Sequence, residues 1–423
     1  MNELKNILLP GTDGFDEATR PWNLAVHQPV AAVVLAESAD DVAAAVSYAR
    51  LNGLTITAQA SGHGASGDSE GLLLLRTDGL TELEIRPGER VARVGAGVKW
   101  GDVLAAAGPH GLTGLAGSSP VVSVTGYTLG GGLSWFSRKY GLAANSVRSF
   151  DIVDAEGVQR TVDAESDPDL FWALRGAGGD FAVVTAIEFD LHPAPHLYGG
   201  RIMWPADRAP EVLAAYREVT ATAPDELTVW FDLLQFPGSP AFVAVDSTYL
   251  GEDPGDLLAP FDKISGAISD SRGPLQVADL GTIAAEPTDP SPGLARAELL
   301  TALDDDVAEL LLAEPIAPLL SVQIRHLGGA LAREADSAAG NLAEPYSIYL
   351  FGIPLPGVPE KLRSLGDTLV PHTTGRRPYT FLAPGDNAAS AFSGETLARL
   401  RELKRARDPR GVLRANYPVG QGL

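Results

Sequence analysis

Apolar and polar positions in the first hundred residues predict short strands that alternate with helices. After an irregular opening to Pro29, the apolar run 31–36 predicts a strand. Apolar residues then follow at helical spacing over 42–49, between Ser38, which fits an N-cap, and Gly53, which fits a helix end. A strand–helix–strand beginning of this kind indicates an α/β layer. Further strands are predicted at 54–58, 72–76, 83–86 and 91–95.

Glycine dominates the stretch from 108 to 132, where we expect no helical or alternating pattern. Beyond it, Glu156-Gly157 is typical of a hairpin turn between two strands. Pro168 fits the first position of a compact helix, and Gly176 fits the position after its end. In this part of the chain we expect helices at 101–107, 133–140 and 167–175 and strands at 150–154, 158–162 and 181–191.

The pattern changes after Pro193-Ala194-Pro195, where longer strands are predicted to alternate with amphipathic helices. One such helix is expected at 297–312, with the acidic run 304–306 on its solvated face. The last helix, 393–404, is basic toward its end and is stopped by Asp408-Pro409. The longer strands are expected at 229–235, 241–249, 321–326 and 347–351.

Charge and composition exclude several classes of function. The 423 residues include 32 Lys and Arg against 54 Asp and Glu, a net charge of −22, which repels nucleic acids and anionic membrane surfaces. The chain has no cysteine, so disulfides, thiolate nucleophiles, iron–sulfur clusters and cysteinyl-linked cofactors are excluded. No apolar run approaches the roughly 18 residues of a membrane span, and no export signal is visible, so we expect a cytoplasmic protein.

Candidate chemistry lies in four glycine-rich segments. Because glycine costs backbone entropy, such clusters outside simple turns indicate a large ligand against the main chain. In so acidic a protein, backbone N–H groups would hold a phosphate-bearing ligand. Taken singly, each segment also fits a flexible loop or core packing, and it is their order and spacing that favour a site. A GxGxxG dinucleotide fingerprint is not formed, since the third glycine comes one position late, at Gly101. The segments are 61–67, 95–97, 126–132 and 175–181.

Two longer motifs carry a family resemblance. Residues 128–142, Thr-Leu-Gly-Gly-Gly-Leu-Ser-Trp-Phe-Ser-Arg-Lys-Tyr-Gly-Leu, and residues 169–185, Asp-Leu-Phe-Trp-Ala-Leu-Arg-Gly-Ala-Gly-Gly-Asp-Phe-Ala-Val-Val-Thr, resemble signatures of the FAD-linked oxidases related to vanillyl-alcohol oxidase and berberine bridge enzyme. The ending 403–416 is similar to the family's Lys…Asp-Pro…Phe-Arg-x-Asn pattern. The match is dense over about 30–195 and returns over the last thirty or so residues.

The resemblance implies a two-domain α+β fold of the PCMH type. Residues 1–195 are expected to form the FAD-binding domain, and the segment 375–423 to complete it. Residues 196–374 are expected to form a substrate-binding domain, an antiparallel sheet that covers the flavin ring.

The resemblance also places the cofactor. His63 falls where many members attach FAD through an 8α-histidyl bond, and neutral imidazole is a suitable nucleophile. Where relatives add a cysteinyl link this chain has Ser119, so the link is expected to be single. Two motifs depart from the family, Gln59-Ala60-Ser61-Gly62-His63 and Ala182-Val183-Val184-Thr185; non-covalent FAD beside His63 is the alternative. The expected FAD contacts are Ser61, Gly62, His63, Gly64, Gly67, Ser119, Val122, Gly126, Gly130, Gly131, Val184 and Asn416.

The reaction implied is hydride transfer from a substrate C–H bond to flavin N5, followed by reoxidation by dioxygen. The turn 126–132 and the tail around Asn416 are candidates to face the charge that develops near flavin N1. Val122 aligns with a position where a small branched residue in relatives admits oxygen, which favours an oxidase.

A base is expected on the middle sheet, over the flavin. Tyr349 is the first candidate, with Gln323 and His326 as rivals, and each also fits ordinary sheet packing. His192 and His196 do not indicate a metal site, because the Pro-Ala-Pro between them favours a loop.

Three functions remain open. The first is an FAD oxidase that acts on a small alcohol, amine or natural-product intermediate of secondary metabolism, with O2 as acceptor. The second keeps the flavin as a dehydrogenase or cyclase with another acceptor. The third is a ligand-sequestering protein that kept the fold.

Overall fold

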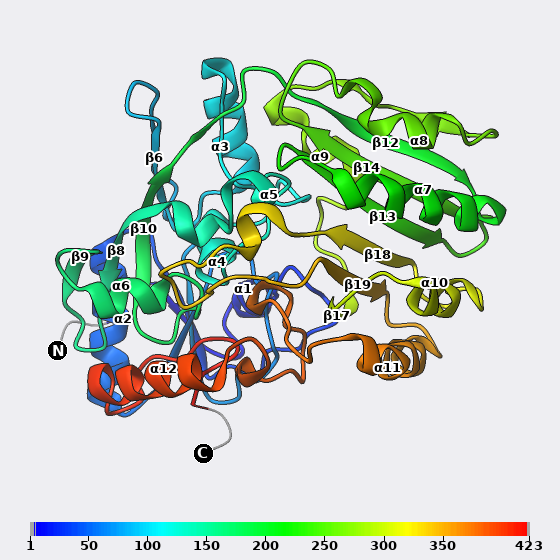
Figure 1. Ribbon diagram of the computed structural model, residues 1–423. Helices are drawn as coiled ribbons and strands as arrows, with labels where there is room; N and C mark the ends of the chain where they lie inside the picture. The colour runs from blue at the N-terminus through cyan, green and yellow to red at the C-terminus, as the bar shows by residue number, and fades with distance from the viewer. Residues whose placement is uncertain (1–3, 5, 421–423) are drawn as a thin grey trace.

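The computed structural model describes residue 4 and residues 6–420, and Figure 1 shows two groups of strands that lie on opposite sides of the molecule. The first part of the chain forms a four-stranded sheet in the order β1-β2-β4-β3. β2 and β3 both pair with β4 in parallel, whereas β1 pairs with β2 antiparallel. Its strands are β1 (Ile7–Leu8), β2 (Ala32–Leu35), β3 (Ile56–Gln59) and β4 (Leu73–Arg76).

The crossover between β2 and β3 forms as its caps predict. Helix α2 (Ala39–Asn52) begins at Ser38, whose side chain accepts a hydrogen bond from the Asp41 N–H, and it ends at Gly53 in the left-handed conformation. The opening before Pro29 is not irregular throughout, because it also contains β1 and the short helix α1 (Phe15–Thr19).

A second, antiparallel sheet has the order β5-β6-β10-β8-β9. Glu156-Gly157 makes the expected turn between β8 and β9, with Gly157 at a φ of 82°. The strands are β5 (Leu83–Arg86), β6 (Val91–Gly95), β8 (Val147–Val153), β9 (Gln159–Asp163) and β10 (Val183–Asp190).

Helices fill the glycine-rich region around this sheet, and the expectation of no regular structure over 108–132 is wrong. α4 (Val124–Leu129) forms because Val124, Thr128 and Leu129 are buried against the core, and tertiary burial overrides the low intrinsic helix propensity of Val124 and Thr128. Of the helix expected at 133–140, only residues 137–140 are helical. The other elements here are α3 (Trp100–Ala107), α5 (Ser137–Tyr140), α6 (Pro168–Leu174) and the paired strands β7 (Leu112–Thr113) and β11 (His192–Pro193).

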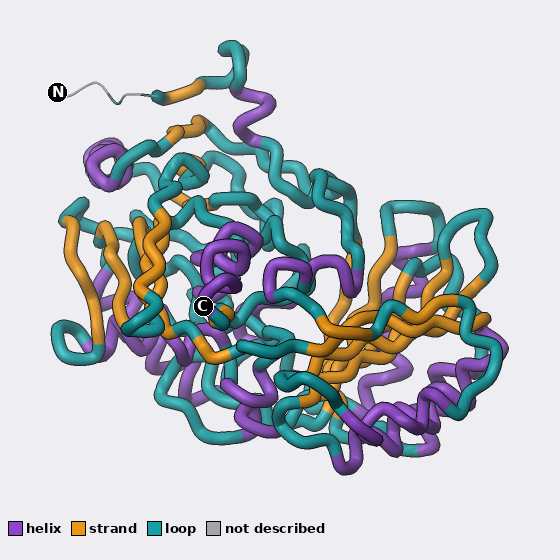
Figure 2. Tube along the Cα trace, turned by 90° about the horizontal axis from the view of Figure 1, so that it is seen from above, coloured by secondary structure: helices purple, strands orange, loops and turns teal. Residues whose placement is uncertain are grey.

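The middle of the chain forms an eight-stranded antiparallel sheet, seen edge-on at one side of Figure 2. Its order is β15-β12-β14-β13-β18-β19-β17, and β16 also pairs with β12. The apolar side chains of one face pack against α7 (Ala209–Thr222), α10 (Asp305–Leu312) and α11 (Val358–Leu369). The strands are β12 (Tyr198–Pro205), β13 (Leu227–Gln235), β14 (Ala241–Tyr249), β15 (Ser269–Asp270), β16 (Gly273–Pro274), β17 (Leu294–Leu300), β18 (Ser321–His326) and β19 (Tyr346–Gly352).

The single helix expected at 297–312 is wrong. Its first residues belong to β17, which pairs with β19 along its whole length, and only the end forms α10. Ala, Glu and Leu favour helices, but cross-strand packing between two neighbouring elements decides the conformation. The acidic run opens the helix, because Asp304 is its N-cap and accepts a hydrogen bond from the Val307 N–H.

The last described segment of the chain runs along the first sheet. α12 (Gly394–Arg407) begins at the N-cap Ser393, and its C-cap is Asp408. The tail then runs beside β3, where Ile56 donates to the Val412 carbonyl at 2.7 Å and Arg414 donates to the Ile56 carbonyl at 2.9 Å. The two ends of the sequence thus build one region of the molecule.

The remaining short helices connect these elements. α8 (Ala259–Asp262) and α9 (Gly281–Ala284) lie between β14 and β17 in the chain. Among the described residues, no helix combines the length and apolar character that crossing a membrane requires. Single 3-10 turns occur at Gly108–His110, Ala143–Ser146, Ala206–Arg208, Gly255–Leu258, Val277–Asp279, Gly329–Ala332, Val370–His372, Tyr379–Phe381 and Ala388–Ser390.

Candidate functional site

His63 lies in the loop that follows β3, and its ring is fixed on two sides. Its Nδ1 is 2.7 Å from Ser61 Oγ, and its ring stacks on Trp22, with centroids 4.3 Å apart and planes 16° apart. Its other nitrogen, Nε2, is buried and has no hydrogen-bond partner. With the proton on Nδ1, donated to Ser61, the lone pair lies on Nε2.

The protonation state of His63 follows from its surroundings. Burial, reinforced by the positive charge of Lys99, lowers the pKa of His63 to about 4. The imidazole is therefore neutral near pH 7, as a nitrogen nucleophile must be.

The strand before this loop is tied to the C-terminal tail. Gln59 Nε2 donates to Gln28 Oε1 at 2.7 Å and to Asn416 Oδ1 at 2.9 Å, so Asn416 lies beside the loop that carries His63. Lys404 supports the tail by donating to the Leu413 carbonyl and to Asp408. The proposed FAD contacts from both ends of the sequence therefore come together.

The glycine-rich segments are not all alike. A Cβ on Gly95 or Gly97 would lie 2.3 or 2.4 Å from a carbonyl oxygen of the chain itself, so this segment is glycine-rich because of its own packing. This packing accounts for these two glycines without a ligand. By contrast, a Cβ on Gly64 would meet nothing within 4 Å, which leaves open main chain beside His63. Gly62 and Gly67 share the His63 loop, Gly126 lies in α4, and Gly130 and Gly131 follow it directly.

Several buried hydroxyls around these segments have no partner. The oxygens are those of Ser119, Thr125, Tyr127 and Tyr417, and burying a hydroxyl without a hydrogen bond is costly. Together with the free Nε2 of His63, they form a donor and acceptor set that fits a large polar cofactor such as FAD. Val122 is half-buried before α4, and Val184 is buried in β10.

Tyr349 and Gln323 lie side by side on the large sheet. Gln323 of β18 pairs with Asp232 of β13 on one side and with Tyr349 of β19 on the other, so the three share the face turned away from the covering helices. Burial raises the pKa of Tyr349 to about 12, against the opposing effect of the Arg325 charge.

His326 is not brought together with these residues. It lies three positions after Gln323 in the same strand and therefore points to the opposite face. There its Nε2 is 3.0 Å from Arg138 Nη1, and burial followed by the Arg138 charge lowers the pKa of His326 to about 3. The structure thus gives His326 a place in the packing beneath the sheet.

Arg325 and Asp232 are members of this face that the sequence predictions missed. Arg325 Nε donates to Gln323 Oε1 at 2.7 Å, and Gln323 Nε2 donates to Asp232 Oδ2 at 3.3 Å. Burial raises the pKa of Asp232 to about 7, although a hydrogen bond from Ser321 opposes the shift. Polar residues at 321, 323 and 325, alternating with apolar ones, are the signal that could have found this row.

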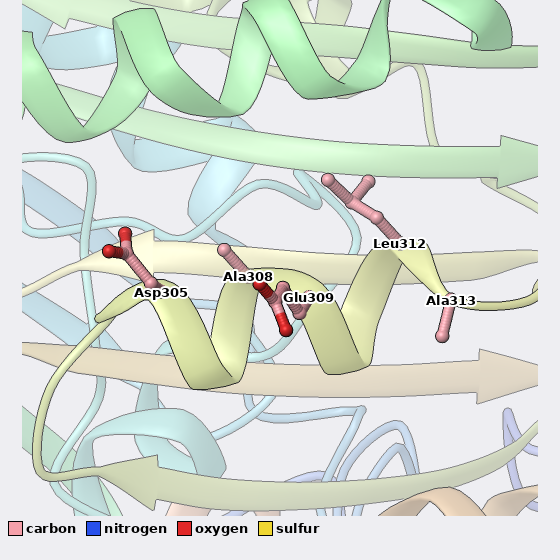
Figure 3. Close-up of a pocket in the computed structure, with 5 residues that line it drawn as sticks. All are labelled: Asp305, Ala308, Glu309, Leu312 and Ala313. Carbon is pink, nitrogen blue, oxygen red and sulfur yellow. The ribbon is translucent and has the colours of Figure 1, made fainter.

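The face also joins the glycine-rich side of the molecule. The Arg325 charge acts on Tyr127 of α4, and Tyr349 packs on Phe381 with ring centroids 5.5 Å apart. The hollow drawn in Figure 3 is a different feature, because it runs along the outer helix α10 and is lined by Asp305, Ala308, Glu309, Leu312 and Ala313.

The two histidines that follow β10, His192 and His196, contact different residues. His192 stacks on Tyr140 and its Nε2 is 2.9 Å from Ser146 Oγ, whereas His196 Nε2 is 3.2 Å from Glu252 Oε1. Within the described part of the chain, no group of three or more potential ligand side chains is placed to hold a metal ion.

Comparison with known proteins gives the class of the site. A family model described as "FAD binding domain" matches residues 30–163. The chain is 34% identical over 201 residues to (R)-6-hydroxynicotine oxidase of Paenarthrobacter nicotinovorans, and the alignment covers 47% of this chain and 44% of that protein. An FAD-dependent monooxygenase of Fusarium proliferatum, FUP4, is 30% identical over 292 residues, 67% of this chain and 52% of the relative. The chain spans about half the length of the curated relatives it matches.

Solved structures show the same fold over nearly the whole chain. Physcomitrella patens BBE-like 1 superposes with a TM-score of 0.87 at 20% identity, covering 99% of this chain and 97% of that one. 6-Hydroxy-D-nicotine oxidase from Arthrobacter nicotinovorans superposes with a TM-score of 0.84 at 24% identity, and the superposition covers 97% of each chain.

The fold and the match together define a flavoprotein class. The protein is an α+β protein whose residues 30–163 match the FAD-binding domain family. More particularly, the expected resemblance to FAD-linked oxidoreductases of the berberine-bridge-enzyme-like type is confirmed, and so is the expected fold class.

Proposed function

We propose that the protein is an FAD-dependent oxidase that takes a hydride from a small organic alcohol, amine or natural-product intermediate, with dioxygen as the electron acceptor. The observation that carries the proposal is the neutral, half-buried His63, whose buried Nε2 lacks a partner beside open main chain at Gly64. The matched FAD-binding domain and the relatives named as oxidases support it.

In the proposed domain organisation, residues 1–195 and 375–423 hold FAD and residues 196–374 form the substrate-binding sheet. The hydrogen bonds between the C-terminal tail and β3 support this division, because they join the two ends of the sequence. The large antiparallel sheet lies within the middle segment and supports the other half of the assignment.

His63 is the proposed site of a single 8α-histidyl link to FAD. When bound, FAD accepts the hydride and passes its electrons to dioxygen. Ser61 keeps the imidazole proton on Nδ1, and Trp22 holds the ring plane, so that Nε2 is directed as a nucleophile. The other proposed contacts are Ser61, Gly62, Gly64, Gly67, Ser119, Val122, Gly126, Gly130, Gly131, Val184 and Asn416.

Tyr349 is the proposed proton acceptor for the substrate hydroxyl or amine. Arg325 lies beside it and partly offsets the burial that raises the pKa of the phenol. Gln323 acts as a positioning residue, because both ends of its amide are already engaged, by Arg325 and by Asp232. His326 on the opposite face supports packing only.

Three measurements test this function. Acid precipitation of the purified protein should leave the yellow colour with the pellet, and His63→Ala should release it. Substrate-dependent release of hydrogen peroxide distinguishes the oxidase from a dehydrogenase or cyclase. Anaerobic bleaching of the flavin by a ligand distinguishes either enzyme from a ligand-sequestering protein. The cytoplasmic location and the role in secondary metabolism stay predictions.

A further inference from the structure

We propose that Arg325 binds a carboxylate group of the substrate, so that the protein oxidises an organic acid with a planar frame. The inference rests on the proposed function, since it names the substrate class of the same site. It follows from the surroundings of one guanidinium group on the large sheet.

The Arg325 side chain is buried among aromatic rings. Its guanidinium carbon lies 4.1 Å from the ring centroid of Trp230 and 5.0 Å from that of Phe381, and Tyr349 follows at 5.8 Å. The residue is only 6% exposed. Flat apolar walls around a cation fit a ligand that combines a planar frame with a negative group.

Arg325 is the cation of this sheet that lacks an ion pair. Arg201 is paired with Asp246 through two hydrogen bonds of 2.6 and 2.8 Å, and Arg296 is paired with Glu298 at 2.8 Å. No carboxylate of the described residues lies within ion-pair distance of Arg325. An unpaired buried charge is costly, and a ligand anion would remove that cost.

Arg325 uses its Nε in a hydrogen bond, and its two terminal guanidinium nitrogens stay available to a ligand. Nε donates to Gln323, and Asp232 fixes the Gln323 amide from the other side, so the guanidinium plane is held. Neither terminal nitrogen has a partner within the described residues, and neither is sealed from solvent. Two parallel N–H groups in one plane match the two oxygens of a carboxylate better than a single anionic oxygen.

Two of the unpartnered hydroxyls that fit the cofactor also lie near this face of the sheet. Tyr127 and Tyr417 each have a buried hydroxyl without a partner. The charge of Arg325 acts on the Tyr127 hydroxyl, and Tyr417 interacts electrostatically with Tyr349. The acid Glu286 also acts on Arg325, but it is exposed and forms no ion pair with it. The buried acid Asp232 acts on Arg325 as well, but its oxygens accept hydrogen bonds from Ser321 and Gln323 and it forms no ion pair with Arg325. A bound carboxylate would therefore be the ion-pair partner that Arg325 lacks.

Calorimetric titration of the yellow holoprotein tests the assignment. Three probes are used at about pH 8: benzoate, its neutral isostere benzamide, and pentafluorophenolate, which carries a single anionic oxygen. We expect benzoate to bind roughly tenfold or more tightly than either comparison ligand, as for a charge-assisted bidentate pair. Equal binding of benzoate and benzamide, a preference for the phenolate, or no benzoate binding would overturn the proposal.

Variants at the same position sharpen the test. Arg325→Met removes the charge at similar volume, and Arg325→Lys keeps the charge but loses the planar fork. We expect both to lose at least about tenfold in benzoate affinity with benzamide binding unchanged. The matched control is Arg296→Gln, on the same sheet but already paired, which should bind benzoate like the parent protein. Unchanged benzoate binding by both Arg325 variants would contradict the assignment.

Failure of the inference and of the proposed function can be told apart. A colourless protein with no affinity for FAD would end the proposed function. A yellow protein that fails the benzoate comparison would overturn only the role of Arg325. Flavin absorbance and thermal denaturation of each variant show that the site is assembled before it is titrated.

Discussion

The indole rings of Trp135 and Trp230 lie flat on each other, with centroids 3.6 Å apart and planes 15° apart. Trp135 follows the glycine run after α4, and Trp230 belongs to β13 of the large sheet. Since Arg325 lies on the Trp230 ring, a continuous stack runs from the 128–142 motif to the polar face of the sheet. The two tryptophans thus fix the glycine-rich region relative to the residues that would meet the substrate.

Replacing His63 should separate flavin attachment from folding. We expect His63→Ala to release all flavin into the supernatant on acid precipitation, because no other described side chain combines a free nucleophilic nitrogen with this loop. The matched control His110→Ala, at an exposed position, should keep its colour in the pellet. Colour that stays with precipitated His63→Ala would refute the histidyl link.

Replacing Tyr349 should slow flavin reduction without loss of FAD. We expect Tyr349→Phe to reduce the anaerobic bleaching rate by roughly a hundredfold, as for removal of a general base. Because the pKa of Tyr349 is raised to about 12, the parent rate should increase with pH through the accessible alkaline range. Stopped-flow absorbance measures both effects. If Tyr349→Phe bleaches at the parent rate, Tyr349 is not the base.

Buried histidines should make the fold sensitive to acid. Burial lowers the pKa of His192 from 6.5 to about 4, so between these values the unfolded chain binds more protons than the folded one. The contribution of His192 to the free energy of unfolding is therefore fully present above about pH 6.5. It is lost as the pH drops toward 4, which lowers the free energy of unfolding by ~3 kcal/mol. Urea titrations at several pH values should show a smaller decrease for His192→Gln. An identical pH dependence would contradict the role of His192.

The C-terminal tail should depend on one buried carboxylate. Asp180 accepts hydrogen bonds from the Ala415 and Val419 N–H groups at 2.8 and 2.7 Å, so Asp180→Ala leaves both donors unpaired. We expect it to destabilise the protein by about 3–5 kcal/mol and to expose the tail to proteases. The control Asp169→Ala removes an exposed ion pair with Arg399 and should cost at most about 1 kcal/mol. Thermal denaturation and limited proteolysis compare the two.

Local signals in the sequence predicted many elements well. The caps Ser38 and Gly53 bound α2, and the ranges expected for β5 and β6 are those observed. These features depend on neighbouring residues, so a short stretch of sequence contains the information. The region 297–312 was predicted wrongly, because pairing with β19, some fifty residues later, made a strand of residues that favour a helix.

The sequence by itself predicted an FAD-binding domain, because the motifs that resemble FAD-linked oxidases lie in short continuous stretches. Only the tertiary structure decided which polar groups share a face and which are sealed from water. Asp232, Gln323 and Tyr349 are far apart in the chain and meet through strand register, while His326 is turned away by the alternation of one strand. The free nitrogen of His63 and the unpaired guanidinium of Arg325 are likewise products of packing, because burial and partnership arise only when distant segments are brought together.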